Sequence, residues 1–415
     1  MKIKKYVDKG RNRLTKVLGR IVPHNTQYKP TGVCRIDLQK LNELDTSEVK
    51  AHVVYPQAET TLNISESLFA ACSEYWKPKR KVVTDYIVVE LPNGRIYTDN
   101  ESSVAVISKY KRVVEHVSLS LENGKVTEPN LNNIFEQRYF TPPHKLNGTV
   151  YSLLTGGAGL NNISHWFVDV LPRLHLLRKS GLYDEIDWFL VPSLRYEYQR
   201  ETFELLGIPA EKLVPGDQYP HVAADRLIAS TAPRGNFTLV PTWLCDYIQS
   251  SFMPLADADD EPVEDMPYVY ISRSDSSFRN VLNEKELVEK IEPYGFKTMI
   301  SSQYSIKQKI KIFANAKVVM GACGAGLINF MFCKPGTTAI EIFNEGFILE
   351  PFYDIANKVG LDHRYIICKG NSKIKDAGKG QREHVRIEID KVTALLDKLR
   401  KEEKLELKRK QPQVV

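Results

Sequence analysis

The chain has 415 residues, of which 42% are hydrophobic and 26% charged, the composition of an ordinary folded protein with room for two or three domains. The 57 Lys and Arg residues only slightly outnumber the 51 Asp and Glu residues, and the net charge of +6 is too small to indicate nucleic-acid binding. This balance is compatible with an anionic ligand or an acidic membrane surface.

The cysteines and the apolar runs exclude further classes of protein. The six cysteines form no Cys-x-x-Cys pair and have no metal-ligand spacing, so the sequence indicates neither a disulfide framework nor a zinc site. The longest apolar run, residues 318–333, is shorter than the ~18 residues that a membrane-spanning helix needs. Nothing at the start resembles a signal peptide, so we expect a cytoplasmic protein with reduced thiols.

Residues 1–25 interleave eight Lys and Arg residues with Ile, Val and Leu, the pattern of a basic amphipathic helix. Such a helix could lie on anionic lipid and hold the protein peripherally at the inner face of the cell membrane. It could equally be a terminal helix docked on its own protein with a solvated basic face. At the other end, segment 386–415 predicts a charged helix from residue 389 to about 407 and a basic tail.

Residues 26–254 are expected to form an N-terminal domain in two parts. Residues 30–150 carry short strand signals and predict a β-rich part, in which strands at 86–91 and 96–98 form a hairpin through the Asn93-Gly94 turn. From 150 to 252 strands and helices alternate, which predicts a Rossmann-like part. The expected strands are 188–191 and 226–229, and the expected helices are 196–206 and 242–252.

The acidic, proline-flanked segment 255–266 is the best candidate for a linker. After it, residues 267–385 alternate regularly between strand and helix, which implies right-handed crossovers and a parallel sheet. The expected strands are 268–272, 296–300 and 364–368, and the expected helices are 283–294, 305–316 and 350–359. Asn283 with Glu286, and Ser305 with Gln308, predict capping boxes at two of these helices.

A glycine-rich turn lies within this second half. Residues 318–322 read as a buried strand, and Gly321, Gly324 and Gly326 let the backbone after it approach a ligand closely. A short helix that begins there would direct unpaired N–H groups at the turn, which is how a doubly wound sheet holds a phosphate or diphosphate. The alternative is a tight turn packed for its own sake.

A histidine and an aspartate stand four residues apart in the first half. If a helix begins near Ser164, His165 and Asp169 lie one turn apart on one face, close to its positive end. Pro172 removes one helical hydrogen bond and should kink the helix beside them. The two side chains could act as a general base, or Asp169 could merely orient His165 in a structural role.

Three motifs occur in order along the chain. The first is N-x-x-H-W-x-x-D-x-L-P-R, with Asn162, His165, Trp166, Asp169, Leu171, Pro172 and Arg173. The second is I-S-R with a later Arg and N-E, at Ile271, Ser272, Arg273, Arg279, Asn283 and Glu284. The third is G-A-x-G-A-G-L-x-N, from Gly321 to Asn329, with a later P-G and I-E-I around Glu341. Together they resemble glycosyltransferase family 61, over roughly residues 148–370.

The resemblance implies an α/β fold of GT-B type, in which two Rossmann-like domains face each other across a cleft. It implies inverting transfer of a hexosyl or pentosyl group from a nucleotide sugar, with UDP as the expected nucleotide, to a hydroxyl of a glycan or lipid-linked glycan. Bacterial members look like enzymes of capsule and other surface polysaccharide biosynthesis. The resemblance also implies that residues 26–254 are the acceptor-side domain and that residues 267–385 are the donor domain.

Site roles follow from the resemblance, because one-step inversion needs a base for the acceptor hydroxyl and positive groups for the departing diphosphate. We expect Asp169 to be the base, with His165 as its reserve or orienting partner. Arg273, assisted by Arg279, is expected to grip the phosphates. The other expected donor-binding residues are Cys323, Gly324, Ala325, Gly326, Asn329 and Glu341. Asn162, Trp166 and Arg173 are expected to have acceptor-side or structural roles.

Two of these residues have alternative interpretations. Glu341 is a lone carboxylate in an apolar strand and could accept hydrogen bonds from ribose hydroxyls or form a salt bridge with an arginine. Relatives usually carry His where this chain has Cys323, and a rival interpretation makes this cysteine a nucleophile.

The sequence also bears on the need for a cofactor and on competing functions. No D-x-D-type metal motif stands beside the glycine turn, so neither a metal nor another cofactor is expected. The competing functions are a non-catalytic nucleotide- or sugar-binding protein that retains the two-domain shell, and an NAD-dependent enzyme. The spacing of Gly321 and Gly324 does not reproduce G-x-G-x-x-G, which disfavours the NAD-dependent enzyme.

Overall fold

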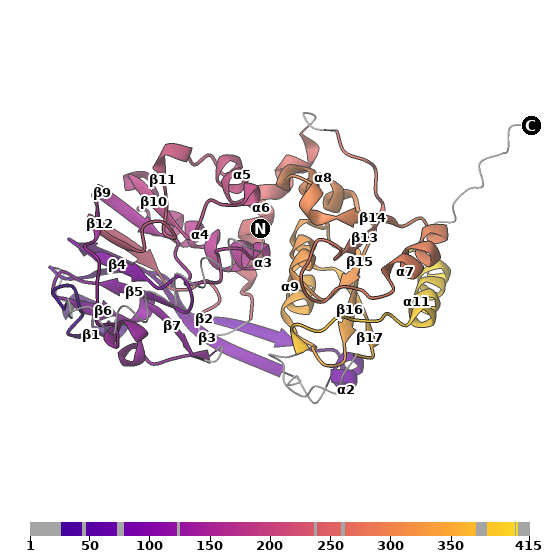
Figure 1. Ribbon diagram of the computed structural model, residues 1–415, viewed down its shortest axis with the longest axis horizontal. Helices are drawn as coiled ribbons and strands as arrows, with labels where there is room; N and C mark the ends of the chain where they lie inside the picture. The colour runs from indigo at the N-terminus through magenta and orange to yellow at the C-terminus, as the bar shows by residue number, and fades with distance from the viewer. Residues whose placement is uncertain are drawn as a thin grey trace, which may run out of the picture.

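The computed structural model describes residues 26–43, 47–72, 79–122, 125–235, 239–258, 262–370, 380–402 and 404–405. The basic segment 1–25 and the tail 408–410 lie outside these ranges. The described chain forms a mixed α/β structure with two sheets, one in each half (Figure 1). None of its helices is long and apolar enough to cross a membrane.

The N-terminal half is built on a 12-stranded sheet within the described residues. The neighbouring strands β12, β9, β10 and β11 are parallel, and the strands before residue 127 extend the sheet on the other side of β12 in mainly antiparallel pairs. The strands are β1 Gly32–Cys34, β2 Lys50–Asn63, β3 Lys79–Pro92, β4 Arg95–Thr98, β5 Ser103–Ile107, β6 Arg112–Val114, β7 Leu119–Glu122, β8 Lys125–Val126, β9 His144–Ser152, β10 Trp188–Val191, β11 Leu213–Pro215 and β12 His221–Ser230. The β-rich and the alternating parts are therefore both present, and they share one sheet.

The helices of this half include a wide turn between two α-helical pieces. They are α2 Glu66–Cys72, α3 Ile163–His165, the π-helical turn η5 Trp166–Val170, α4 Arg173–Lys179, α5 Glu197–Leu205 and α6 Thr242–Phe252. The helix is interrupted beside Pro172, because the π turn ends at Val170 and Pro172 is the N-cap residue of α4.

The hairpin expected at residues 86–98 is wrong. In the described sheet β3 and β4 do not pair with each other, and both run antiparallel to β12 in one register, with Pro92 opposite Arg226 and Arg95 opposite Ala223. Asn93 adopts a φ of +51°, and its N–H donates to the carbonyl of Asp225 on β12 at 2.7 Å. The Asn-Gly pair therefore interrupts one long strand locally without reversing it and without shifting its register against β12.

The C-terminal half is a five-stranded parallel sheet in the order β14-β13-β15-β16-β17, as the alternation predicts. Its strands are β13 Tyr268–Ser272, β14 Lys297–Ile300, β15 Val318–Ala322, β16 Thr338–Asn344 and β17 Asp362–Cys368. Its helices are α7 Glu284–Ile291, α8 Ile306–Asn315, the 3-10 helix η11 Ala325–Phe332, α9 Pro351–Val359 and α11 Ile389–Lys401. The glycine-rich turn thus joins a buried strand to a short helix, as expected.

One of the two expected capping boxes is confirmed. Ser305 Oγ accepts from the N–H of Gln308, and the Gln308 side chain accepts from the N–H of Ser305, both at 3.0 Å. Asn283 makes no side-chain cap on α7. Its side chain accepts from the N–H of Ile387 at 2.9 Å and donates to Glu286, so the segment before α11 has taken the place of the cap.

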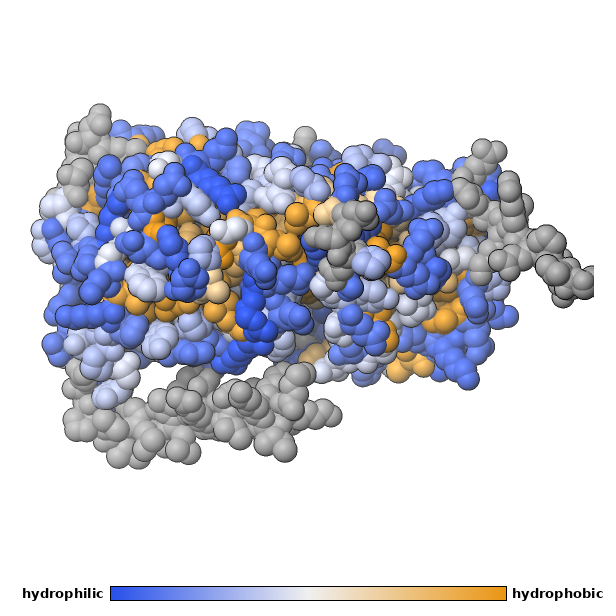
Figure 2. Space-filling model, turned by 90° about the horizontal axis from the view of Figure 1, so that it is seen from above, coloured by the Kyte–Doolittle hydropathy of each residue, from blue (hydrophilic) through white to orange (hydrophobic). Residues whose placement is uncertain are grey.

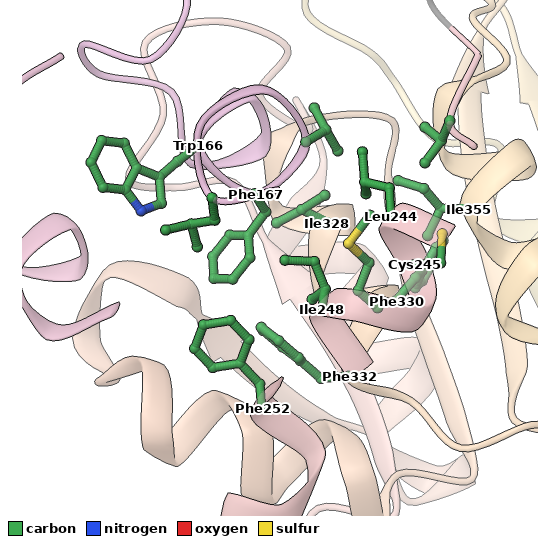
Figure 3. Close-up of a cluster of buried hydrophobic side chains, with 14 of the residues drawn as sticks. Trp166, Phe167, Leu244, Cys245, Ile248, Phe252, Ile328, Phe330, Phe332 and Ile355 are labelled. Carbon is green, nitrogen blue, oxygen red and sulfur yellow. The ribbon is translucent and has the colours of Figure 1, made fainter. Parts of the chain in front are cut away.

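The two halves share one hydrophobic core. Phe167 of η5, Phe252 of α6 and Phe332 of η11 are buried with ring centroids 5.4–6.1 Å apart, so aromatic rings from both halves pack together (Figure 3). Apolar residues also gather in patches on the upper surface, including near the middle of the molecule (Figure 2).

A second connection is made by β2, α2 and β3, which we call the arm. It extends from the N-terminal sheet alongside the C-terminal half (Figure 1). The Tyr353 hydroxyl of α9 accepts from the N–H of Ser65 at 3.2 Å and donates to the carbonyl of Asn63 at 3.1 Å. Arg80 of β3 forms an ion pair with Glu350 at the start of α9. The arm thus fixes α9 against the N-terminal half.

Candidate functional site

Arg273 and the glycine-rich turn meet at one edge of the C-terminal sheet. β13 ends at Ser272, directly before Arg273, and the adjacent strand β15 ends at Ala322, directly before Cys323 and Gly324. The chain leaves β13 for β14 on one side and later reaches β15 on the other, so the strand order reverses between these carboxyl ends. Open α/β sheets form their ligand crevice at such a point.

The Arg273 guanidinium is buried and holds the loop that follows it. Nη2 donates to Ser276 Oγ and to the carbonyl of Phe278, and Nε donates to the carbonyl of Arg279, each at 2.9 Å. Burial, together with the charge of Arg279, lowers the pKa of Arg273 to about 10, so the side chain stays charged at neutral pH. Nη1 lies against Gly324, which places the charge directly at the turn.

Arg279 presents a second cation beside the turn in a strained conformation. Its φ is +56°, a region that non-glycine residues rarely adopt and that often marks functional sites. Its guanidinium lies 5.1 Å from the ring centroid of Phe347, and its buried Nε has no hydrogen-bond partner among the described residues. A cavity of about 10 Å³, the size of one water, adjoins Arg279, Cys323 and Asn344.

The Cys323 thiol is buried at the turn, in surroundings that disfavour the reactive thiolate. It is only 5% exposed, and burial together with the Glu341 carboxylate raises its pKa well above the ordinary value. Glu341 is itself fully buried, with Oε2 3.2 Å from Nε2 of His363 and Oε1 unpartnered among the described residues. Among the described residues the ion-pair partner of Glu341 is thus a histidine and not the arginine of the alternative interpretation, and the buried carboxylate has no surface exposed to a ribose.

The helix η11 begins at Ala325, so the N–H groups of Gly324, Ala325 and Gly326 belong to its first turn. Asn329 is buried, and its Nδ2 donates to the carbonyl of Gly326 at 2.8 Å. Asn329 therefore braces the turn from inside and does not face solvent.

The side chains of His165 and Asp169 meet as expected. Asn162 caps α3 by accepting from the N–H of Ser164 at 3.0 Å, and Nδ1 of His165 lies 2.6 Å from Oδ2 of Asp169. The imidazole is 38% exposed, whereas the carboxylate is 15% exposed. The ring is therefore the more accessible member of the pair, and its other nitrogen, Nε2, is not the one that contacts Asp169.

A third member of this group, Arg234, has no signal in the sequence, because it is a lone arginine in the loop after β12. Its Nε donates to Oδ1 of Asp169 and its Nη2 to Oδ2, both at 2.8 Å. Burial acts to raise the pKa of Asp169, but the Arg234 charge and the hydrogen bonds from His165 and Arg234 outweigh it and hold this pKa well below its usual value. A carboxylate held ionised in this way is a weak proton acceptor.

Trp166 and Arg173 support this group from within the core. Trp166 is fully buried and its Nε1 donates to Thr202 Oγ1 at 2.9 Å. Arg173 donates from Nε to the backbone carbonyl of Asp169 at 3.0 Å and from Nη1 to the carbonyl of Ser230 at 2.8 Å. Both residues thus fix the π turn that carries Asp169.

The two groups of residues lie on neighbouring elements. Helix α3, which ends at His165, contacts η11, which begins at Ala325. The fold therefore brings the first and third sequence motifs together across the junction of the two halves, as Figure 3 shows for Phe167 and Phe332.

Comparisons with known proteins bear on this arrangement. The family model of glycosyltransferase 61 matches residues 163–340. A search of curated proteins finds no match. Among solved structures, the iron-containing heptosyltransferase TibC in complex with ADP-D-β-D-heptose has 13% identity and a TM-score of 0.29, covering 70% of this chain and 83% of its own. TibC from enterotoxigenic E. coli, in a second structure, has 10% identity and a TM-score of 0.27, covering 77% and 80%.

TM-scores this low support no argument from TibC. The family match spans the His165–Asp169 group, Arg273 and the glycine-rich turn. The resemblance drawn from the three motifs is thereby confirmed: residues 163–340 belong to glycosyltransferase family 61, and the chain is a glycosyltransferase.

Proposed function

We propose that the protein is an inverting glycosyltransferase of GT-B type that transfers a sugar from a nucleotide donor, with UDP as the expected nucleotide, to a hydroxyl of a glycan or lipid-linked glycan. The observation that carries the proposal is the contact between α3, which ends at His165, and η11, which begins at the glycine-rich turn where Arg273 lies against Gly324. Surface polysaccharide biosynthesis at the cytoplasmic face of the membrane is the proposed process.

The diphosphate of the donor is proposed to bind at the switch point of the C-terminal sheet. Arg273 and Arg279 supply positive charge there, and the first N–H groups of η11 supply further donors. These groups stabilise the negative charge that develops on the departing nucleoside diphosphate. Because two guanidinium groups occupy this position, we propose that transfer requires no metal.

His165 is proposed as the base, in place of Asp169. The ionised Asp169 accepts the Nδ1 proton of His165, which leaves the lone pair of Nε2 free to accept a proton. Nε2 takes the proton of the acceptor hydroxyl while its oxygen attacks the anomeric carbon. The bond from that carbon to the diphosphate oxygen breaks, and the leaving group departs with the electron pair, which inverts the configuration.

The experiment incubates the purified protein with UDP-, GDP- and CMP-sugars, with NAD as a control, and follows thermal stability and release of the free nucleotide. We expect one class of nucleotide sugar to raise the melting temperature and to be turned over in EDTA. Tight binding without turnover would favour the non-catalytic binding protein. Activity that vanishes on chelation and returns with manganese would contradict metal independence.

The domain division and the membrane contact are also proposed. Residues 26–254 would bind the acceptor and residues 267–385 the donor, joined by segment 255–266. Residues 1–25 would hold the protein on anionic lipid, and their removal should abolish sedimentation with phosphatidylserine-containing vesicles but leave donor hydrolysis unchanged.

A further inference from the structure

We infer that Arg234 is a positioning residue, which holds the Asp169 carboxylate and through it sets the tautomer and orientation of the His165 ring. The kinetic part of this inference rests on the proposed function. The state of the ring can be measured without any turnover.

The contact between Arg234 and Asp169 is a bidentate pair. Nε and Nη2 reach one carboxylate oxygen each, both at 2.8 Å, which fixes the plane of the carboxylate as well as its position. The two side chains are each 15% exposed, so water weakens this pair less than a surface pair. With Arg173 holding the backbone carbonyl of the same residue, the whole of Asp169 is fixed by two arginines with separate tasks.

The held carboxylate determines which nitrogen of His165 carries the proton. Oδ2 lies 2.6 Å from Nδ1 and is ionised, so Nδ1 must donate and Nε2 is left as an acceptor. Nη2 of Arg234 also lies 3.3 Å from Nδ1, so the guanidinium, the carboxylate and the ring are held together at this nitrogen. The carboxylate that Arg234 holds therefore favours the tautomer with its proton on Nδ1, which leaves Nε2 free as a general base requires.

The loop that carries Arg234 is placed by the arm. Gly235 has a φ of +57°, and a Cβ there would come within 2.7 Å of Thr84 Oγ1 on β3. A glycine is therefore required at this approach, both for its backbone conformation and for the space. The close contact sets the position from which Arg234 reaches Asp169.

The experiment compares Arg234→Gln, Asp169→Asn and the double variant with the wild-type protein. Arg195→Gln, which removes the ion-pair partner of Asp217 in the same half, is the matched control. We expect Arg234→Gln to lower kcat by about 10- to 100-fold, the range of impaired general-base catalysis, with the donor KM within about threefold of wild type. The double variant should be no slower than Asp169→Asn, because Arg234 acts through Asp169. Losses that multiply would overturn the inference.

Nitrogen-15 NMR of labelled histidines reads the ring directly. We expect the neutral ring of His165 in the wild-type protein to carry its proton on Nδ1, and the Nε2 tautomer to gain population in Arg234→Gln. An identical ring in both proteins would overturn the inference. If no nucleotide sugar is turned over, the proposed function fails, and the NMR comparison still decides the role of Arg234. If Arg234→Gln does not fold, Arg234→Lys, which keeps the charge but not the fork, replaces it in the same comparison.

Discussion

Gly324 lies directly against the guanidinium of Arg273, and a Cβ at this position would overlap Nη1. The backbone of Gly324 is extended, with φ and ψ both at 171°, a conformation open to any residue. The glycine is therefore required for the space beside Arg273. Adding one methyl group at this position tests whether the donor binds here.

Gly324→Ala should displace the Arg273 guanidinium and weaken its hydrogen bonds to Ser276 and Phe278. Because hydrogen bonds of a charged group contribute about 1.5–3 kcal/mol each, we expect donor affinity to fall at least about tenfold. Isothermal titration with UDP measures the change. Gly32→Ala is the control, since nothing lies within 4 Å of its added methyl group, and it should bind UDP like the wild type. Equal affinity in both variants would place the diphosphate elsewhere.

Cys323→Ala should keep substantial activity, because a neutral buried thiol gives a weak donor and no nucleophile. Arg273→Ala should weaken donor binding severely, through loss of both its charge and the loop it holds. Michaelis constants for one donor, measured side by side, test the two assignments. An inactive Cys323→Ala protein beside an unaffected Arg273→Ala protein would overturn both.

His165→Ala should reduce turnover by at least about 100-fold, the typical contribution of a general base, while donor binding persists. Asp169→Asn should cause a loss of similar size, because the ring then lacks its acceptor on Nδ1. Single-turnover kinetics with saturating donor measures both. Near-normal turnover of His165→Ala would return the role of base to Asp169 or to another carboxylate.

His221 predicts a loss of stability in mild acid. Burial lowers its pKa to about 4, while Nδ1 donates to the Thr141 carbonyl at 2.7 Å and Arg95 donates to Nε2 at 2.9 Å. Below pH ~6.5 this histidine binds a proton in the unfolded chain but stays neutral in the folded protein. The free energy of unfolding therefore falls between pH ~6.5 and ~4, by at most about 3 kcal/mol.

Urea denaturation at pH 7.5 and pH 4.5 measures this loss. His221→Phe should reduce the difference between the two values without abolishing it, since the pKa of His175 is likewise lowered to about 4 by burial and nearby Lys179 and Arg178. A difference unchanged by His221→Phe would contradict the assignment.

Much of the fold could be predicted from local pattern. Strand Tyr268–Ser272 and helix Thr242–Phe252 have the expected bounds, because prolines precede both and their apolar periodicity is regular. The Asn93-Gly94 pair led to the wrong prediction of a hairpin. The same dipeptide that closes hairpins can also interrupt a single strand, when a distant strand, here β12, pairs with it on both sides of the interruption.

The site was predictable where its residues share a motif. His165, Asp169, Arg273 and the glycine-rich turn are such residues, and the structure places them on adjoining elements. Arg234 was not predictable, because it reaches Asp169 from a loop 65 residues further along the chain. Because the sequence does not reveal the contact with Arg234, it favoured Asp169 as the base. Once the contact is known, we propose the His165 imidazole in its place.

The arm constrains when the chain can complete its folding during synthesis. Ser65 and Ser67 meet their partners Tyr353 and Tyr365 across 288 and 298 residues of chain, so a ribosome must make nearly the whole protein before the arm can dock. Until then the apolar side chains of the arm lack their final contacts and remain exposed, and exposed apolar surface promotes aggregation. A nascent chain that stops before β17 should therefore depend on chaperones, and neither half should be expressible alone as a well-behaved fragment.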